Sequence, residues 1–177
     1  SALAKKSAIE LIAWNGDNAY FKEVLPFTAS GDEVVRTAGF KALSSLAGPD
    51  NQAELIKLLS AAEDKNYIGY IQEALASAAG KIADPEKRSD EMLKAMENSS
   101  VKGKIIPVLA STGGREALRT VLKEFENGNP DMRDICFKTL TSWKDYTASS
   151  ALYEICASGN KTFEEPAFEG YIKQIKE

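Results

Sequence analysis

Apolar residues recur every three or four positions along most of this chain. Val35, Ala38, Leu43 and Leu46 stand near i, i+3, i+8 and i+11, and the segment 118–125 carries a stripe of the same kind. This spacing fits the 3.6-residue period of a helix, and no segment alternates strictly as a half-buried strand would. The pattern therefore predicts an all-α fold.

Glycine, proline, asparagine and aspartate divide the helical segments at regular intervals. One set of turns lies at 15–17, 48–50, 84–86, 113–114 and 144–145, and a second set lies between them at 30–32, 64–66, 98–100, 127–130 and 158–160. Gly and Pro end helices, and Asp or Asn caps the next one. Eleven helices are expected, at 2–14, 17–29, 32–47, 51–62, 66–83, 87–97, 100–112, 114–126, 131–143, 147–157 and 162–176. Pro26 and Pro107 should each kink or end the helix that contains them, because proline lacks the N–H that a helix interior needs.

The turns also define an internal repeat. The residues Arg36, Phe40, Lys41 and Leu43 recur in step as Arg133, Phe137, Lys138 and Leu140. The offset of 97 residues equals three units of about 32 residues, a period typical of helical solenoids. We therefore expect residues 1–177 to form a single domain, a right-handed α-α superhelix of about five helix pairs. Phe40 and Phe137 should occupy matching positions in it.

Composition narrows the classes of function. The chain has 177 residues with a net charge of −4, and it has no basic stripe of the kind that nucleic acids require. It contains no histidine, which removes the commonest general base, the His-dependent nucleophiles and most zinc sites. No apolar run is long enough to span a bilayer. We expect no catalytic residues, no cofactor and no metal.

The start of the chain also carries information. It begins with Ser1 rather than methionine, inside a predicted helix, and Lys5 and Lys6 are followed by an amphipathic stretch without a cleavage site. We expect the chain to be a part or a processed form of a longer protein.

Two segments resemble the second helix of HEAT repeats. They read Asp32, Val35, Arg36, Ala38 and Leu43 in one unit, and Asp131, Met132, Arg133 and Leu140 in the other. The resemblance implies a HEAT-like or armadillo-like solenoid in which Asp32, Arg36, Asp131 and Arg133 make polar contacts between adjacent units. Segments 68–71 and 101–104 depart from this pattern.

A narrower resemblance lies near the C-terminal end. The segments 140–148 and 168–173 resemble the HEAT-type region of large bacterial exported proteins that also carry a 3-keto-disaccharide hydrolase domain. The resemblance implies export to the periplasm or cell surface. It also implies that any carbohydrate chemistry belongs to another domain, because this chain shows no trace of the hydrolase sandwich.

Aromatic residues are the main candidates for a binding surface. Trp14 and Trp143 each precede a turn between units and could stack on a sugar or a peptide, together with Tyr146. The structural alternative, which we favour for both tryptophans, is that they cover the apolar end of a helix pair. The tyrosines as a group could line a groove but are also ordinary core residues: Tyr67, Tyr70, Tyr146, Tyr153 and Tyr171.

Other candidate sites have simpler structural explanations. Cys136 and Cys156 fall on neighbouring helices, where two buried free thiols are favoured over a disulfide because packed helix axes lie too far apart. The acidic pairs at 90–91 and 164–165 suit the positive ends of helix dipoles better than a glycosidase mechanism. Gly113 and Gly114 read as a turn and not as a phosphate loop.

These observations favour a non-catalytic interaction or scaffold module of a larger protein. Stacked helix pairs offer an extended surface for a protein partner or for a neighbouring domain of the same chain. The alternative is an accessory domain of a carbohydrate-active enzyme, and nucleic-acid binding is disfavoured by the charge.

Overall fold

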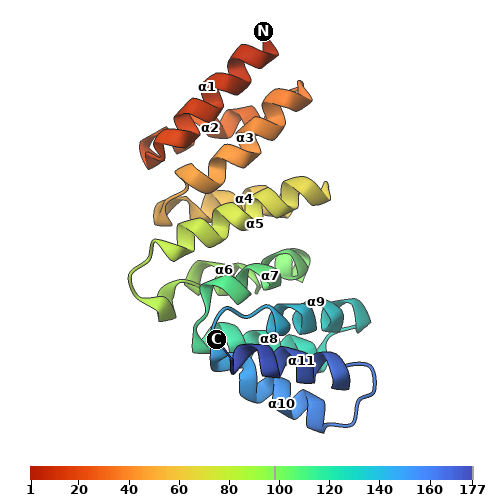
Figure 1. Ribbon diagram of the computed structural model, residues 1–177. Helices are drawn as coiled ribbons and strands as arrows, with labels where there is room; N and C mark the ends of the chain where they lie inside the picture. The colour runs from red at the N-terminus through yellow and green to blue at the C-terminus, as the bar shows by residue number, and fades with distance from the viewer. Residues whose placement is uncertain (98, 177) are drawn as a thin grey trace. The chain divides into compact units, whose positions relative to one another are not determined.

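A computed structural model describes residues 1–97 and 99–176 (Figure 1). All regular secondary structure in this part of the chain is helical, and it contains no strand. Position 98, inside the predicted turn at 98–100, lies outside the described residues. The chain divides into two compact units, Ser1–Ala83 and Asp84–Glu177. The expectation of an all-α fold is confirmed, whereas a single domain over 1–177 stays a prediction.

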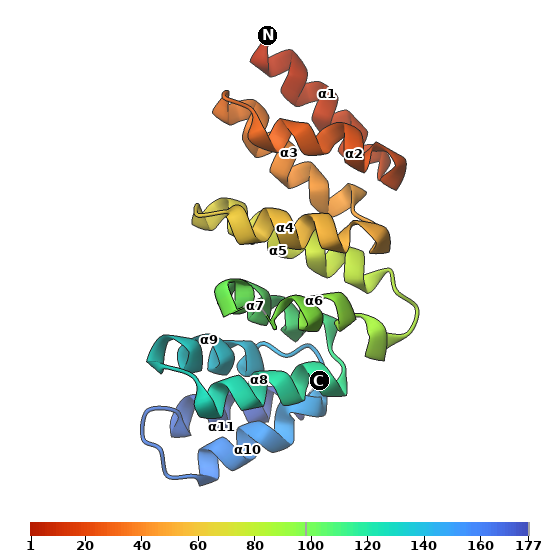
Figure 2. The same ribbon diagram turned by 180° about the vertical axis from the view of Figure 1, so that it is seen from behind.

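Unit 1 holds five α-helices and three 3-10 helices. In chain order they are α1 (Ala2–Asn15), η1 (Asn18–Tyr20), α2 (Phe21–Val24), η2 (Leu25–Ala29), α3 (Glu33–Leu46), η3 (Pro49–Asn51), α4 (Gln52–Ala61) and α5 (Lys65–Gly80). Helices α1, α3 and α5 form a row in which each packs on the next, while η2 packs on α3 and α4 packs on α5. Figure 2 shows the α2 and α4 side of this row.

Unit 2 repeats the arrangement. Its elements are η4 (Pro85–Lys87), α6 (Asp90–Ala95), η5 (Ser99–Val101), α7 (Lys102–Thr112), α8 (Arg115–Asn127), α9 (Pro130–Thr141), η6 (Tyr146–Ala148), α10 (Ser149–Ala157) and α11 (Glu164–Gln174). Helices α7, α9 and α11 pack in series, with α8 against α9 and α10 against α11. In each unit a row of second helices is therefore covered by first helices.

The local sequence explains where most helices begin. Asp32 caps α3, since its carboxylate accepts hydrogen bonds from the backbone N–H groups of Val34 and Val35. Asn129 caps α9 in the same way through the N–H of Met132. These two caps stand 97 residues apart, the offset of the sequence repeat. Each satisfies backbone donors that the first helical turn leaves free.

The repeat also holds in the core. Phe40 and Phe137 are both buried, and Leu43 and Leu140 are fully buried in α3 and α9. Phe40 and Phe137 are thus both buried in the helices that carry the repeat, while the superposition of these two helices stays a prediction. Removing even one methylene group at either leucine should lower the stability of the fold, because protein interiors are close-packed.

Two proline expectations have different outcomes. At Pro26 the α-helix ends as expected: α2 stops at Val24 and the 3-10 helix η2 follows from Leu25, so the segment 17–29 is not one continuous α-helix. At Pro107 the helix does not end, because α7 runs on to Thr112. Pro107 is exposed while its neighbours Ile106 and Val108 are buried, so packing holds the helix together despite one missing backbone hydrogen bond.

Candidate functional site

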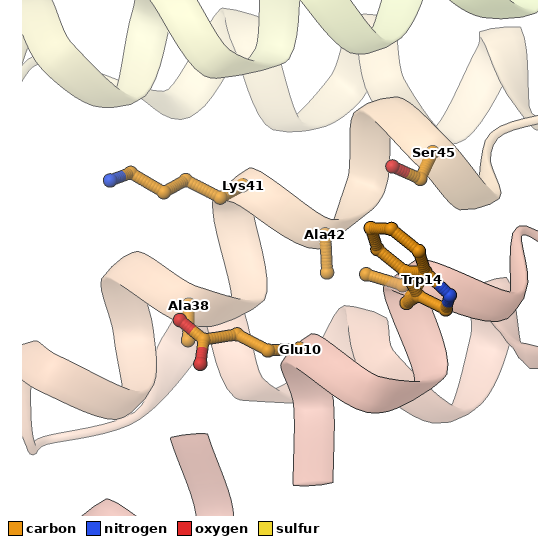
Figure 3. A pocket seen from close by; sticks show the side chains of 7 residues that line it. Glu10, Trp14, Ala38, Lys41, Ala42 and Ser45 are labelled. Carbon is orange, nitrogen blue, oxygen red and sulfur yellow. The ribbon is translucent and has the colours of Figure 1, made fainter. Parts of the chain in front are cut away.

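The most exposed aromatic residue stands beside a groove in unit 1. Trp14 lies in the last turn of α1 and is 90% exposed. It borders a groove of about 280 Å³ between α1 and α3 (Figure 3). Ala38 and Ala42 of α3, both buried, form part of the groove wall, and Ser45 lies near its Trp14 end. Small side chains on α3 therefore leave space that the Trp14 indole flanks. The favoured expectation that Trp14 covers a buried helix end is wrong.

Both signs of charge border the groove. Glu10 of α1 and Lys41 of α3 line it, and they also line an adjoining groove of about 320 Å³ that extends toward Lys6 and Glu33. The Lys6 Nζ lies 3.6 Å from the Glu10 Oε1. The Lys41 Nζ lies 5.5 Å from the centroid of the Tyr70 ring, within range of a cation–π interaction. Such a groove can receive an apolar side chain while Glu10 and Lys41 offer hydrogen bonds to a polypeptide backbone and ion pairs to charged side chains.

Trp143 does not form a surface site. It follows α9 and is 3% exposed, so its proposed role as a surface-binding aromatic is wrong. The backbone of the next residue, Lys144, donates a hydrogen bond to the carbonyl of Ala110 at the end of α7. Trp143 is thus buried, as the structural alternative that the sequence favoured requires.

Tyr146 is exposed but is not part of the groove. It is 74% exposed in η6 of unit 2 and is not among the residues that line the groove at Trp14. The other tyrosines pack on neighbours: Tyr67 stacks on Phe40, and the Tyr153 ring centroid lies 5.6 Å from that of Tyr171. Of the aromatic candidates, Trp14 is the most exposed, and it lines a groove.

Asp32 and Arg36 differ in how far they fit the role that the HEAT resemblance implies. Asp32 caps its own helix. Arg36 does join neighbouring helices: its Nε donates to the Tyr67 hydroxyl of α5 at 3.0 Å, and its Nη1 donates to the Ser30 carbonyl at 2.8 Å. The hydrogen bond with Tyr67 is the main cause of a raised pKa of Arg36. An inter-helix role therefore holds for Arg36 and is wrong for Asp32.

In unit 2 the corresponding arginine binds within one helix pair. Arg133 donates from Nε to the Phe125 carbonyl at 3.0 Å and from Nη2 to the Glu126 carbonyl at 3.1 Å. Both carbonyls lie in the last turn of α8, where acceptors lack intrahelical partners. Asp131 lies in the first turn of α9, where its negative charge interacts favourably with the positive end of the helix dipole. The resemblance implied a contact between adjacent helix-pair repeats. Arg133 instead makes a contact within the single pair α8–α9.

The buried cysteine, Cys136, offers no nucleophile. Both thiols are free; Cys136 is fully buried in α9, and Cys156 is half-buried. Burial, followed by the nearby charge of Glu124, raises the pKa of Cys136 to about 12. A thiol with such a pKa stays protonated at neutral pH and is a poor nucleophile.

Residues 1–97 and 99–176 contain no group of three or more Cys, Asp or Glu side chains that could hold a metal ion. Glu164 and Glu165 lie in the first turn of α11, and Asp90 and Glu91 lie in that of α6. Both acidic pairs thus lie at the positive ends of helix dipoles, as their structural explanation requires.

Comparisons with protein-family models, curated protein sequences and solved structures gave no significant match for this chain. Among the described residues, no helix combines the length and the apolar character needed to cross a membrane. The interpretation of the site therefore depends on the geometry of this chain alone.

The sequence did not identify the two apolar neighbours of Trp14 as part of a surface. Leu3 and Leu11 of α1 are 69% and 72% exposed. Their spacing relative to Trp14, i, i+8 and i+11, was visible in the sequence as a helical stripe. The sequence could not show that the stripe faces solvent, because the same spacing marks the buried face of α3.

Proposed function

We propose that this chain is a non-catalytic interaction module of a larger protein, built as a HEAT-like solenoid of helix pairs. The arrangement of each unit as a row of second helices with first helices against them supports this proposal. So does the 97-residue correspondence between α3 and α9 in caps and buried side chains. Modules of this kind act through extended binding surfaces.

The observation that carries the proposal is the exposure of Trp14 beside the α1–α3 groove. An indole with 90% of its surface in water is unusual for a residue that folded proteins normally bury in large part. Tryptophan is enriched among the residues that dominate protein interfaces. The partner we propose is a polypeptide, either another protein or a neighbouring domain of the same chain, which places an apolar side chain against Trp14.

The absence of catalysis forms part of the same proposal. The sequence has no histidine, and the thiol of Cys136 is buried with a raised pKa. Besides Glu10 and Lys41, the side chains that line the groove include one potential nucleophile, the hydroxyl of Ser45. That hydroxyl has no general base of the usual kind to activate it.

Site-specific photocrosslinking tests the proposal. A photoreactive amino acid at Ser45, next to the groove, should give a polypeptide adduct in cells that produce the full-length protein. The same amino acid at Ser150, an exposed serine of α10, serves as the matched control. The Ser45 adduct should be lost in Trp14→Ala and retained in Tyr146→Ala. A Ser45 probe that gives no polypeptide adduct, or an adduct that Trp14→Ala leaves intact, would contradict a partner site at this groove.

The same tryptophan favours one second candidate, an accessory domain that binds carbohydrate. A flat exposed ring beside Glu10 and Lys41 offers a stacking face and polar partners to a sugar. Oligosaccharide titrations followed by Trp14 fluorescence, with Trp14→Phe as the control, separate the two candidates. Saturable quenching by a sugar, without a polypeptide adduct, would favour the carbohydrate function.

A further inference from the structure

The chain contains two Asn-Gly sequences, and each lies at the C-terminal end of a helix. Asn15 is the last residue of α1 with Gly16 as its C-cap, and Asn127 is the last residue of α8 with Gly128 as its C-cap. Asparagine before glycine is chemically labile, because the next backbone nitrogen can approach the side-chain amide without a Cβ in the way. The two sites share this sequence chemistry, so the structure around each decides which one reacts.

The reaction is a deamidation that consumes only water. The backbone nitrogen of the glycine releases its proton and attacks the Cγ atom of the asparagine side chain. A bond forms between this nitrogen and Cγ, the bond between Cγ and Nδ2 breaks, and Nδ2 leaves as ammonia with the released proton. Water then opens the resulting cyclic imide at either of its carbonyl carbons, which gives aspartate or isoaspartate. No atom is oxidised or reduced.

The structure restrains Asn127 against this reaction. Its Nδ2 donates a hydrogen bond to the Lys123 carbonyl at 2.9 Å, and the Gly128 N–H donates to the Glu124 carbonyl at 2.9 Å. A Cβ at Gly128 would lie 2.8 Å from the Met132 Cγ, so this turn is closely surrounded. The side-chain amide and the attacking nitrogen are therefore both held in hydrogen bonds, and the backbone has little room to move.

The turn at Asn15 is more open. The Gly16 N–H donates to the Ala13 carbonyl at 3.2 Å, which is at the long limit for such a bond. The Asn15 side chain is exposed and, within the part of the chain that the structure describes, makes no hydrogen bond. A Cβ at Gly16 would meet no atom within 4 Å. Local opening at this helix end therefore breaks one long hydrogen bond and displaces no packed neighbour.

We propose that Asn15 is a site of spontaneous deamidation in the folded protein, and that the reaction loosens the end of α1. The aspartate product adds a negative charge to the last turn of α1, where the helix carbonyls already carry partial negative charge. The isoaspartate product routes the backbone through the former side chain and so inserts a methylene group before Gly16. The Gly16 N–H is then displaced from the Ala13 carbonyl, and the hydrogen bond that ends α1 is lost.

Timed incubation of the folded protein at mildly alkaline pH, followed by peptide mapping, tests the proposal. Trypsin cleaves after Lys and Arg, so Asn15 falls in the peptide 7–22 and Asn127 in the peptide 124–133. Tandem mass spectrometry locates the replacement of NH2 by OH, and an unincubated sample corrects for deamidation during digestion. Asn15 should react at least about fivefold faster than Asn127, the factor expected from the further hydrogen bond that Asn127 must break.

Two controls separate the effect of the fold from that of the sequence. In urea-denatured protein, Asn15 and Asn127 should deamidate at similar rates, because each precedes a glycine. The matched variant is Asn15→Gln, since the longer glutamine side chain forms the cyclic imide far more slowly. Incubated wild type should lose thermal stability as Asn15 is converted, whereas Asn15→Gln incubated in the same way should keep its unfolding temperature.

The proposal is overturned by either of two results. One is a folded protein in which Asn15 reacts no faster than Asn127, or stays intact while the denatured protein is converted. That result would show that the end of α1 is as closed to the reaction as the end of α8. The other is a converted protein with the unfolding temperature of the fresh one, which would show that the reaction leaves the end of α1 in place.

Discussion

The ring of Phe40 stacks on the ring of Tyr67, with centroids 4.4 Å apart and planes inclined by 15°. The contact joins the middle of α3 to the first turn of α5, and the Tyr67 hydroxyl accepts the hydrogen bond from Arg36. In unit 2, Phe137 of α9 has its ring centroid 4.7 Å from that of Phe163, the residue before α11. The repeated phenylalanine thus contacts an aromatic ring at the start of the next second helix in both units.

This contact predicts measurable coupling between Phe40 and Tyr67. We expect a double-mutant cycle of Phe40→Leu and Tyr67→Leu to give a coupling free energy of about 0.5–1.5 kcal/mol, because an aromatic pair contributes beyond its buried area. Urea denaturation of the four proteins measures it. A cycle between Phe40→Leu and Tyr153→Leu, which lie in different units, is the control and should show additive effects. Additivity in the first cycle would contradict a stabilising stack.

The repeated leucines predict matching losses of stability. Leu43→Ala and Leu140→Ala should each lower the free energy of unfolding by about 2–4 kcal/mol, because both side chains are fully buried and each change leaves a cavity. Glu164→Ala should stay within about 0.5 kcal/mol, since Glu164 is an exposed residue of the first turn of α11. Chemical denaturation of the three variants checks this. A loss at Glu164 as large as at the leucines would mean that the start of α11 is buried against a partner.

The positions of the helices along the chain were predictable because they depend on local sequence signals. Each of the eleven expected helical segments contains one α-helix of the described chain, and capping residues such as Asp32 and Asn129 stand where the turns were expected. The segment 17–29 was the exception, since periodicity cannot reveal that Pro26 favours 3-10 geometry over a continuous helix. At Pro107 a local rule was overridden by the burial of Ile106 and Val108 on either side.

The candidate site was less predictable because exposure depends on tertiary neighbours. Trp14 and Trp143 occupy the same kind of place in the sequence, before a turn between units. One is 90% exposed and the other 3% exposed, a difference that the tertiary neighbours of each side chain decide. The sequence likewise suggested Arg36 as a contact between helices but did not indicate that Tyr67 would accept its hydrogen bond.

Two helical glycines should respond in opposite directions to alanine. At Gly39 a Cβ would lie 3.0 Å from the backbone of Phe27 and of Thr28, so Gly39→Ala should lower stability by about 1–3 kcal/mol as α3 is forced away from η2. At Gly69 in α5 a Cβ would meet open space, and Gly69→Ala should raise stability by about 0.5–1 kcal/mol through better helix propensity. Thermal and urea unfolding of the two variants measure both effects. A neutral Gly39→Ala would contradict the close approach of η2 to α3.

The raised pKa of Cys136 predicts how stability depends on alkaline pH. Its pKa of about 12 in the folded chain exceeds the ordinary thiol value of about 8.5–9, because burial disfavours the thiolate. The stabilising contribution of the protonated thiol is therefore complete below the unfolded pKa. It is lost as the pH rises from that value toward 12, since the unfolded chain releases the proton first.

We expect the wild type to lose more stability than Cys136→Ala between about pH 8 and pH 10, when each is compared with its own value at pH 7. Lysine and tyrosine titration affects both proteins alike, so the difference between them isolates the thiol. A thiol reagent at pH 8 should modify the half-buried Cys156 first and Cys136 only after unfolding. Rapid modification of Cys136 in the folded chain, or identical pH profiles for the two proteins, would show that this thiol is not held protonated in the core.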